Sequence, residues 1–238
     1  GTEVRLTVKK KLDGSTKVIS IIRDVVELEE TFVKSSIVEK NGKKYAIIDL
    51  PKFYISFDDQ NYRDSAKDME KEIERLKKEN VSGLIIDLRN NGGGSLKTAI
   101  EISGLFIDKG PVVQVCDGAN RVQVNSDKDG YSYYDGPLTV MVDRYSASAS
   151  EIFSAAIQDY GRGVIVGEHT FGKGTVQQHR PLGRIYDLYD NPLGSVQFTI
   201  AKFYRIDGGS TQHKGVIPDI LYPSAVEPAE WGESQAEN

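Results

Sequence analysis

Residues 84–105 decide the fold, and they read Leu-Ile-Ile-Asp-Leu-Arg-Asn-Asn-Gly-Gly-Gly-Ser-Leu-Lys-Thr-Ala-Ile-Glu-Ile-Ser-Gly-Leu. The apolar run at 84–86 predicts a short buried strand, which the Asn-Asn-Gly-Gly-Gly sequence at 90–94 ends. Apolar residues then recur at helical spacing, which predicts a helix that begins near Leu96. A buried strand that leads directly into a helix is the building unit of α/β proteins.

The same alternation of strands and helices continues on both sides of this stretch. Amphipathic patterns predict helices over about 66–80 and from about 148 to 159. The sequence predicts an α/β fold for the body of the chain. Strands are predicted at 44–50, 53–55, 112–116, 137–142, 164–166 and 195–206.

The two ends of the chain have a different character. Alternating residues at 3–8 and 17–22 flank a turn at 12–15, so a small β-hairpin is predicted at the N-terminus. A hairpin alone is marginally stable, so we expect it to be the remnant of a larger unit. Residues 24–36 read as a linker, and the Pro-, Glu- and Ser-rich stretch at 223–238 predicts a flexible tail.

Composition excludes several functional classes. A formal net charge of −5 without a basic tract argues against nucleic acid as the main partner. No apolar stretch approaches the roughly 20 residues of a membrane-spanning helix, so we expect no stable membrane insertion. The single cysteine, Cys116, cannot form an internal disulfide, and the three histidines lack metal-ligand spacing. We therefore expect neither a metal ion nor another cofactor.

The glycine-rich turn at 90–94 offers a place for negative charge. Its glycines permit positive φ, and backbone amides at the start of the following helix point outward with the positive end of the helix dipole. An oxyanion can bind there. Taken alone, the turn also fits a tight connection capped by Ser95.

A second turn from strand to helix carries a candidate nucleophile. Ser148 lies within Ser-Ala-Ser-Ala-Ser at 146–150, where small neighbours let a substrate backbone approach its hydroxyl. The amide of Ala149 can donate to a developing oxyanion, with a glycine amide of the first turn as the second donor. Helix capping by Ser146 or Ser148 is the alternative for this run alone. The motif Gly-x-Ser-x-Gly is absent, which argues against an α/β-hydrolase.

A lysine and a glutamine complete a catalytic set that needs no histidine. Lys173 lies between two glycines with no carboxylate beside it in sequence, and a neutral lysine can accept a proton from a serine. Gln177 follows four residues later, a spacing that puts both side chains on one face of a strand or of a helix, so it can orient the amine without adding charge. As an isolated Gly-Lys-Gly, the segment also fits a surface loop.

Four motifs in one order give the chain a resemblance to the C-terminal processing (tail-specific) serine proteases. The resemblance runs from about Thr31 to Tyr222, and segments at 194–197 and 215–219 also fit it. Any one of the motifs would be weak evidence, whereas four in the same order are specific. They are Asp-Leu-Arg-Asn-Asn-Gly-Gly-Gly at 87–94, Ser-Ala-Ser-Ala-Ser-Glu at 146–151, Gln-Asp-Tyr-Gly at 158–161 and Thr-Phe-Gly-Lys-Gly-Thr-Val-Gln at 170–177.

The resemblance implies a catalytic role for three residues. Ser148 is the implied nucleophile, and Lys173, which lies 25 positions later, is the implied general base. Gln177 is the residue implied to orient the lysine. In such a mechanism the serine forms an acyl-enzyme, and the lysine then activates the water that hydrolyses it.

The resemblance also implies residues that assist the reaction. The backbone amides of Ala149 and Gly94 are the implied oxyanion donors, with Gly93 as the close alternative. Supporting positions in the motifs fall on Glu151, Asp159 and Thr170. We expect structural roles for these three residues rather than chemical ones.

Fold and domain organisation follow from the same resemblance. The implied fold is an α/β spiral of β-β-α units, akin to ClpP and the crotonases. Residues 1–30 are then the last strands of a PDZ domain with its linker, and 31–222 the catalytic core. Residues 223–238 follow as the tail.

The implied function is that of an ATP-independent endopeptidase that degrades or processes proteins from or near their C-termini. Its partners would be proteins or peptides with accessible C-termini, and the resemblance leaves room for an adaptor protein. The Gram-negative members imply a bacterial periplasmic or cell-envelope location.

Three alternatives stay open on the sequence alone. A triad of Ser148, His169 and Asp159 would use an imidazole base, although no motif supports it. A crotonase-like acyl-CoA enzyme would use the same paired amides to hold an enolate. A non-catalytic peptide-binding module would need none of the three implied catalytic residues.

Overall fold

The computed structural model describes residues 1–11, 13–23, 31–55, 63–183, 194–224, 227 and 230–235. They belong to two compact units, Gly1–Glu30 and Thr31–Asn238. The first unit contains the predicted hairpin, in which β1 (Glu3–Lys9) pairs antiparallel with β2 (Thr16–Ile22). Large apolar side chains of this hairpin are exposed, Ile22 by 73%. That the hairpin is the end of a PDZ domain stays a prediction.

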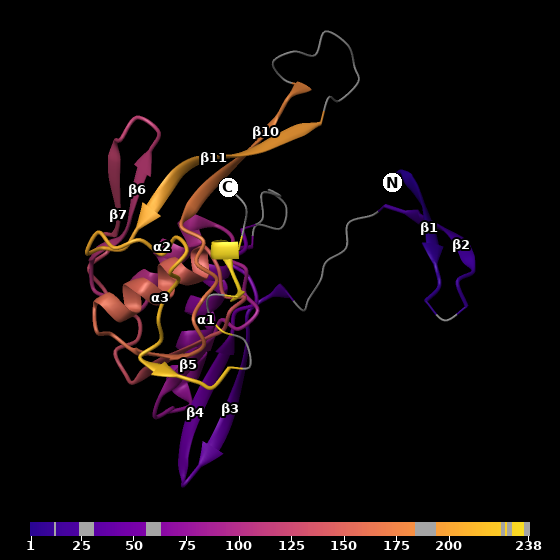
Figure 1. The fold of residues 1–238 in the computed structure, drawn as a ribbon. Coiled ribbons are helices and arrows are strands. Elements are labelled where there is room, and N and C mark those ends of the chain that lie inside the picture. Colours follow the sequence, from indigo (N-terminus) through magenta and orange to yellow (C-terminus); the bar gives the residue numbers. More distant parts are fainter. Residues whose placement is uncertain are drawn as a thin grey trace. The chain divides into compact units, whose positions relative to one another are not determined.

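The second unit is a mixed α/β structure (Figure 1). Its described residues include a six-stranded sheet in the order β12-β9-β8-β5-β4-β3. All neighbours in it are parallel except β3 and β4. The predicted α/β class is confirmed, whereas the ClpP-like spiral stays a prediction. The strands are β3 (Lys34–Lys40), β4 (Lys43–Asp49), β5 (Leu84–Asp87), β8 (Leu138–Val142), β9 (Val164–Gly167) and β12 (Ile220–Leu221).

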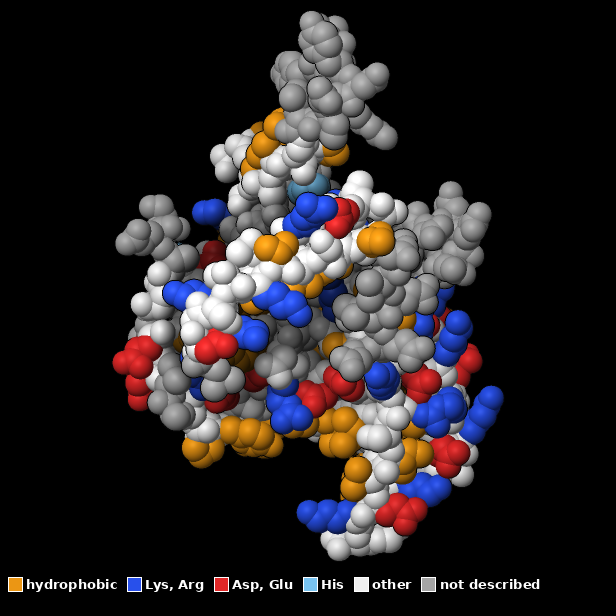
Figure 2. All heavy atoms as spheres, turned by 90° about the vertical axis from the view of Figure 1, so that its right-hand side faces the viewer, with side chains coloured by type: hydrophobic (Ala, Val, Ile, Leu, Met, Phe, Trp, Pro, Cys, Tyr) orange, Lys and Arg blue, Asp and Glu red, His pale blue; other side chains and the backbone are white. Residues whose placement is uncertain are grey.

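A second sheet has four described strands in the order β10-β11-β6-β7, and all of its pairs are antiparallel. Figure 1 shows β10 and β11 as a ribbon that extends away from the helices. Hydrophobic side chains gather on the upper part of this ribbon (Figure 2), where Val196, Phe198 and Ile200 are exposed. The strands are β6 (Gly110–Asp117), β7 (Val122–Asp127), β10 (Thr175–Pro181) and β11 (Ser195–Tyr204).

Three α-helices of the described part belong to this unit, namely α1 (Ser65–Lys78), α2 (Leu96–Gly104) and α3 (Ala149–Asp159). As the periodicity predicts, α1 buries Met69, Ile73 and Leu76. α2 contacts both α1 and α3, and α3 is buried along most of its length. Among the described helices, none has the length and apolar character needed to cross a membrane.

The parallel strands explain why distant segments meet. Neighbouring parallel strands end at the same edge of a sheet. Here β4, β5, β8 and β9 are neighbours in the sheet. The segments that follow them contain Phe53, the glycine turn, Ser148 and Lys173. The topology therefore brings four stretches of sequence to one edge.

The end of the chain differs from the sequence prediction. A flexible tail was expected over 223–238, and the part described at 230–235, although mostly exposed, contacts the catalytic unit. The indole of Trp231 lies 5.1 Å from the ring of Tyr145 and donates a 3.0 Å hydrogen bond to the carbonyl of Arg144. Glu233 N–H also donates to Phe171 O at 3.0 Å. These contacts hold the segment against the turn that precedes Ser148.

Three further details correct the prediction of strands. The last residues of the expected linker 24–36 belong to β3, which begins at Lys34, while 24–30 lie outside the described residues. Residues 53–55 form only isolated bridges, one of them between Phe53 and Gly94. The strands β7 and β10 were not predicted, because polar, exposed residues dominate both.

Candidate active site

Hydrogen bonds join the glycine turn after β5 to the serine turn after β8. Ser146 Oγ donates to Leu88 O at 2.8 Å, and Ser150 Oγ donates to Asn91 O at 2.8 Å. The same Asn91 carbonyl accepts from Ala147 N at 3.0 Å. Two of the three serines in the run 146–150 are therefore buried and serve to fasten the two turns together.

Ser148 differs from the two serines that flank it. It is half-buried, and its hydroxyl donates no hydrogen bond within the described part of the chain. Its backbone has φ 57° and ψ −110°, a strained conformation for a residue with a side chain. Strain of this kind persists only where the surroundings enforce it, and it is concentrated at functional sites. The hydroxyl proton of Ser148 is thus free, and the residue lies at the N-terminus of α3.

The backbone amides of the two implied oxyanion donors are open. Within the described residues, neither Ala149 N nor Gly94 N donates a hydrogen bond to the protein. By contrast, Gly93 N donates to the side chain of Asn91 at 2.9 Å, so it is occupied. Phe53 fixes the turn, because Phe53 N bonds Gly93 O and Phe53 O accepts from Ser95 N. The geometry favours Gly94 over Gly93 as the second donor.

Gly93 has a different function, which is to allow close packing. A Cβ at this position would lie 2.6 Å from Ala147 O, 2.8 Å from Ser148 Cβ and 2.9 Å from Ala149 N. Its φ of 98° is also unfavourable for any other residue. Only glycine lets the first turn approach the serine turn this closely.

Glu151 connects the serine turn to the segment that carries Lys173. Its Oε2 accepts from Ser148 N at 2.8 Å and from Lys173 N at 2.9 Å. Its Oε1 accepts from Thr170 Oγ1 at 2.6 Å and from Gly172 N at 2.7 Å. One buried carboxylate therefore fixes the backbone at positions that are far apart in the sequence.

The electrostatics of Glu151 result from two opposing effects. Burial raises the pKa of Glu151 to about 7, because a carboxylate loses its hydration inside the protein. The hydrogen bonds donated by Thr170, Gly172, Ser148 and Lys173 favour the charged form and lower the pKa. The desolvation effect is the larger one. Glu151 is therefore poised to titrate near neutral pH.

The side chain of Lys173 points to Gln177. Lys173 Nζ donates to Gln177 Oε1 at 3.3 Å, as the four-residue spacing predicts. No carboxylate in the described part of the chain forms an ion pair with this amine. Ser148 Oγ and Lys173 Nζ are not hydrogen-bonded to each other here. In enzymes without substrate, catalytic hydrogen bonds are often long and tighten on binding.

The remaining supporting residues occupy structural positions. Thr170 Oγ1 accepts from Val216 N at 2.6 Å while it donates to Glu151, so it anchors the carboxylate. Asp159 ends α3 and binds the guanidinium of Arg205. That both residues have structural roles stays a prediction.

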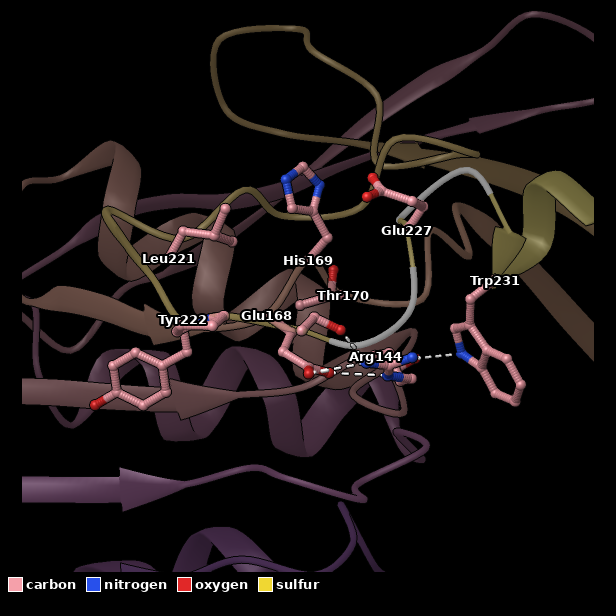
Figure 3. A pocket seen from close by; sticks show the side chains of 10 residues that line it. Arg144, Glu168, His169, Thr170, Leu221, Tyr222, Glu227 and Trp231 are labelled. Atoms are coloured by element: carbon pink, nitrogen blue, oxygen red, sulfur yellow. Dashed lines mark hydrogen bonds and ion pairs between the residues drawn. The ribbon is translucent and has the colours of Figure 1, made fainter.

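The geometry does not favour the triad of Ser148, His169 and Asp159. Asp159 lies at the opposite end of α3 from Ser148, and it is paired with Arg205. His169 lines a pocket with the ion-paired Arg144 and Glu168, as Figure 3 shows. Among the described residues, His169 and Asp159 share no hydrogen bond.

Sequence analysis did not identify two residues that build the site. Asn91 is fully buried, donates to Leu50 O at 2.6 Å and accepts from Gly93 N. Its position before three glycines was a usable signal, because Asn side chains organise turns. Gln197 Nε2 donates to Gln177 Oε1 at 2.8 Å, a contact that sequence spacing could not reveal. The described residues contain no cluster suited to a metal ion.

Comparisons with known proteins identify the family. Residues 44–222 match the model of Peptidase family S41. The chain is 48% identical over 238 residues to the tail-specific protease of Haemophilus influenzae, covering 100% of this chain and 33% of that protein. It is 32% identical over 224 residues to the carboxyl-terminal-processing protease of Picosynechococcus, covering 94% of this chain and 49% of that protein. The chain belongs to Peptidase family S41, which confirms the resemblance seen in its motifs.

A solved structure supports the same assignment. The photosystem II D1 C-terminal processing protease matches with a TM-score of 0.67 and 25% identity, over 93% of this chain and 55% of that chain. The chain thus spans between a third and about half of the length of these relatives.

Proposed function

We propose that this chain is the catalytic core of an ATP-independent serine endopeptidase that uses a Ser148–Lys173 dyad. The observation that best supports the dyad is that Glu151 Oε2 accepts hydrogen bonds from the backbone amides of both residues. The backbone amides of the nucleophile and the base thus donate to the same carboxylate oxygen, although the two residues are distant in sequence. Membership of Peptidase family S41 supports the reaction class.

The reaction begins with the free hydroxyl of Ser148. Its oxygen attacks the scissile carbonyl carbon while Lys173 Nζ takes the hydroxyl proton. The lysine then gives this proton to the leaving amine as the peptide C–N bond breaks, which leaves an acyl-enzyme. A water molecule attacks the ester with Lys173 as its base, and Ser148 is regenerated. The uncharged Gln177 holds the amine without favouring its protonated form.

The tetrahedral intermediate needs donors for its oxyanion. The amides of Ala149 and Gly94 have no protein acceptor in the described part of the chain, so they can donate to it. Ala149 also begins α3, whose dipole favours negative charge at this end. Such preorganised donors contribute about 3–4 kcal/mol each to transition-state stabilisation in acyl-transfer enzymes.

The substrates we propose are proteins or peptides with accessible C-termini, as the names of the relatives indicate. We further propose that residues 1–30 end a PDZ domain, and that the protein acts in the periplasm or cell envelope of a bacterium. An adaptor that presents substrates is compatible with this function. Neither nucleic acid nor stable membrane insertion is part of the proposal.

Two changes test the dyad directly. Ser148→Ala and Lys173→Ala should each abolish cleavage of a fluorogenic peptide and leave the fold intact by circular dichroism, because each removes a reacting group. Ser82→Ala and Lys214→Ala are matched controls at exposed positions and should retain full activity. If the Lys173 variant still cleaves the peptide, Lys173 is not the general base. If the Ser148 variant still cleaves it, Ser148 is not the nucleophile.

A serine-reactive probe separates this proposal from its alternatives. A fluorophosphonate should label Ser148 in the wild-type protein and label it far more slowly in Lys173→Ala. An acyl-CoA enzyme of the crotonase type or a peptide-binding module requires no nucleophile, so an unlabelled Ser148 would favour one of them.

A further inference from the structure

Gln177 Oε1 is shared by two donors. Lys173 Nζ lies 3.3 Å from it, and Gln197 Nε2 lies 2.8 Å from it. The contact with Gln197 is the shorter one, so the orientation of the Gln177 amide depends more on Gln197 than on the lysine. Gln177 and Gln197 are both exposed, and nothing else in the hydrogen-bond pattern of the described residues holds the Gln177 amide.

A β-bulge brings these two glutamines to the same face of the ribbon. Val176 stands opposite Ala201, but Gln177 stands opposite Thr199 because the register shifts between Val176 and Gln177. Gln197 is then the diagonal neighbour of Gln177, within reach of a long side chain. With regular pairing, Gln177 would instead stand opposite Ile200.

The bulge matters because the two faces of β11 differ chemically. Ser195, Gln197 and Thr199 alternate with Val196, Phe198 and Ile200 along the strand. A shift of one residue exchanges one face for the other. In a regular ladder the place of Gln197 as diagonal neighbour of Gln177 would be taken by Phe198, which cannot donate a hydrogen bond.

An amide can turn its oxygen or its nitrogen toward a lysine. In this pair Gln197 presents its Nε2, which can only donate, so the oxygen of Gln177 lies at the shared point and the Gln177 nitrogen points away. The oxygen is also the atom that accepts from Lys173. Without Gln197, the exposed Gln177 amide could rotate, and the amine would lose its fixed acceptor.

We propose that Gln197 is a positioning residue of the peptidase reaction, which acts on Lys173 through Gln177. The inference rests on the proposed Ser148–Lys173 dyad and adds a residue from β11 to it. The lysine then lies just before β10, its acceptor lies in β10, and the residue that orients the acceptor lies in β11.

A double-mutant cycle tests this role. Gln197→Met keeps the length of the side chain but cannot donate, and it should lower kcat about 3- to 10-fold with KM nearly unchanged. Gln177→Met should lower kcat at least as much. Because Gln197 acts only through Gln177, the double variant should be no slower than Gln177→Met alone. Gln178→Met, on the opposite face of the same ribbon, is the matched control and should leave kcat unchanged.

Each outcome of the cycle is decisive. Wild-type kcat in Gln197→Met, or effects that multiply in the double variant, would overturn the inference while the dyad stands. Gln197→Glu is a second test of the same role. The new carboxylate cannot donate a hydrogen bond to Gln177, so this substitution should also lower kcat. Thermal unfolding of all variants shows that the ribbon is intact. Full turnover of Ser148→Ala in the same assay would overturn the proposed function, and this inference with it.

Discussion

At the scale of single residues, Glu151 has the strongest influence on the site. Each of its oxygens accepts two hydrogen bonds, from Ser148 and Lys173 at one and from Thr170 and Gly172 at the other. A glutamine would replace one acceptor by an NH₂ group that cannot accept from these donors. The carboxylate is therefore irreplaceable for geometric reasons, although it takes no part in bond making.

The titration of Glu151 leads to a prediction about stability. Burial raises its folded pKa to about 7, above the ordinary value of 4.5. Because the folded pKa is the higher one, the protonated side chain of Glu151 contributes fully to the stability of the folded state below about pH 4.5. That contribution is lost as the pH rises through about 7. The stability of the wild type relative to Glu151→Gln should therefore decrease by about 3 kcal/mol between pH 4 and 8. Urea unfolding at several pH values measures this difference.

The matched control is Glu101→Gln, which changes an exposed carboxylate paired with Lys97. It should not reproduce the pH-dependent difference. A constant gap in unfolding free energy between wild type and Glu151→Gln across this range would show that the pKa of Glu151 is the same in the folded and unfolded states, so that burial does not raise it.

Much of the site was predictable at this scale, and the limits have physical causes. Ser148, Lys173 and Gln177 stood out because their residue types match a reaction and their motifs match a family. Asn91 and Gln197 were missed, because a hydrogen bond between residues of different elements leaves no periodic signal in the sequence. The resemblance had implied Gly94 ahead of Gly93, and the structure adds that the Gly93 amide already donates to the side chain of Asn91.

At the scale of elements, the glycine turn after β5 provides the sharpest test. Gly93→Ala should abolish peptide cleavage, because the new Cβ would collide with Ala147 O and displace the amide of Ala149. The strain should also lower stability by about 1–3 kcal/mol. A peptide assay and a thermal unfolding curve together measure both effects.

Gly92→Ala is the control for this change. Its Cβ would meet nothing within 4 Å, and its φ is not positive. The variant should fold and cleave like the wild type. Equal activity of the two alanine variants would show that close approach of the turns is not required.

Periodicity identified the elements that are buried and missed those that are exposed. α1, β5, β8 and β9 have apolar residues at helical or continuous spacing, because each packs against the core. β10 reads Thr-Val-Gln-Gln-His-Arg-Pro and exposes most of its side chains. Its strand conformation comes from pairing with β11 rather than from burial, so its sequence contains little evidence of it.

At the scale of the whole catalytic unit, the C-terminal segment supports the serine turn. Trp231→Ala should lower stability by about 1–2 kcal/mol, since it removes a ring contact with Tyr145 and a hydrogen bond to Arg144 O. Peptide cleavage should fall modestly, because the turn before Ser148 loses a support. Chemical denaturation measures the first effect and steady-state kinetics the second.

Glu230→Ala is the control, because it changes an exposed neighbour of Trp231 and leaves both indole contacts in place. It should have wild-type stability. If Trp231→Ala were equally stable, the segment would behave as the flexible tail that its composition predicts. Composition misses the packing here, because one tryptophan is enough to anchor a polar segment.

The double attachment at Glu151 has a consequence for how activity is gained and lost. Since one carboxylate oxygen accepts from the backbone of both the nucleophile and the base, a displacement of Glu151 should disturb the two residues together. A backbone nick between α3 and β9 would leave the halves fastened to each other. Conversely, a ligand that displaces the backbone at 170–174 should also shift the backbone of Ser148 through Glu151, without contacting the serine.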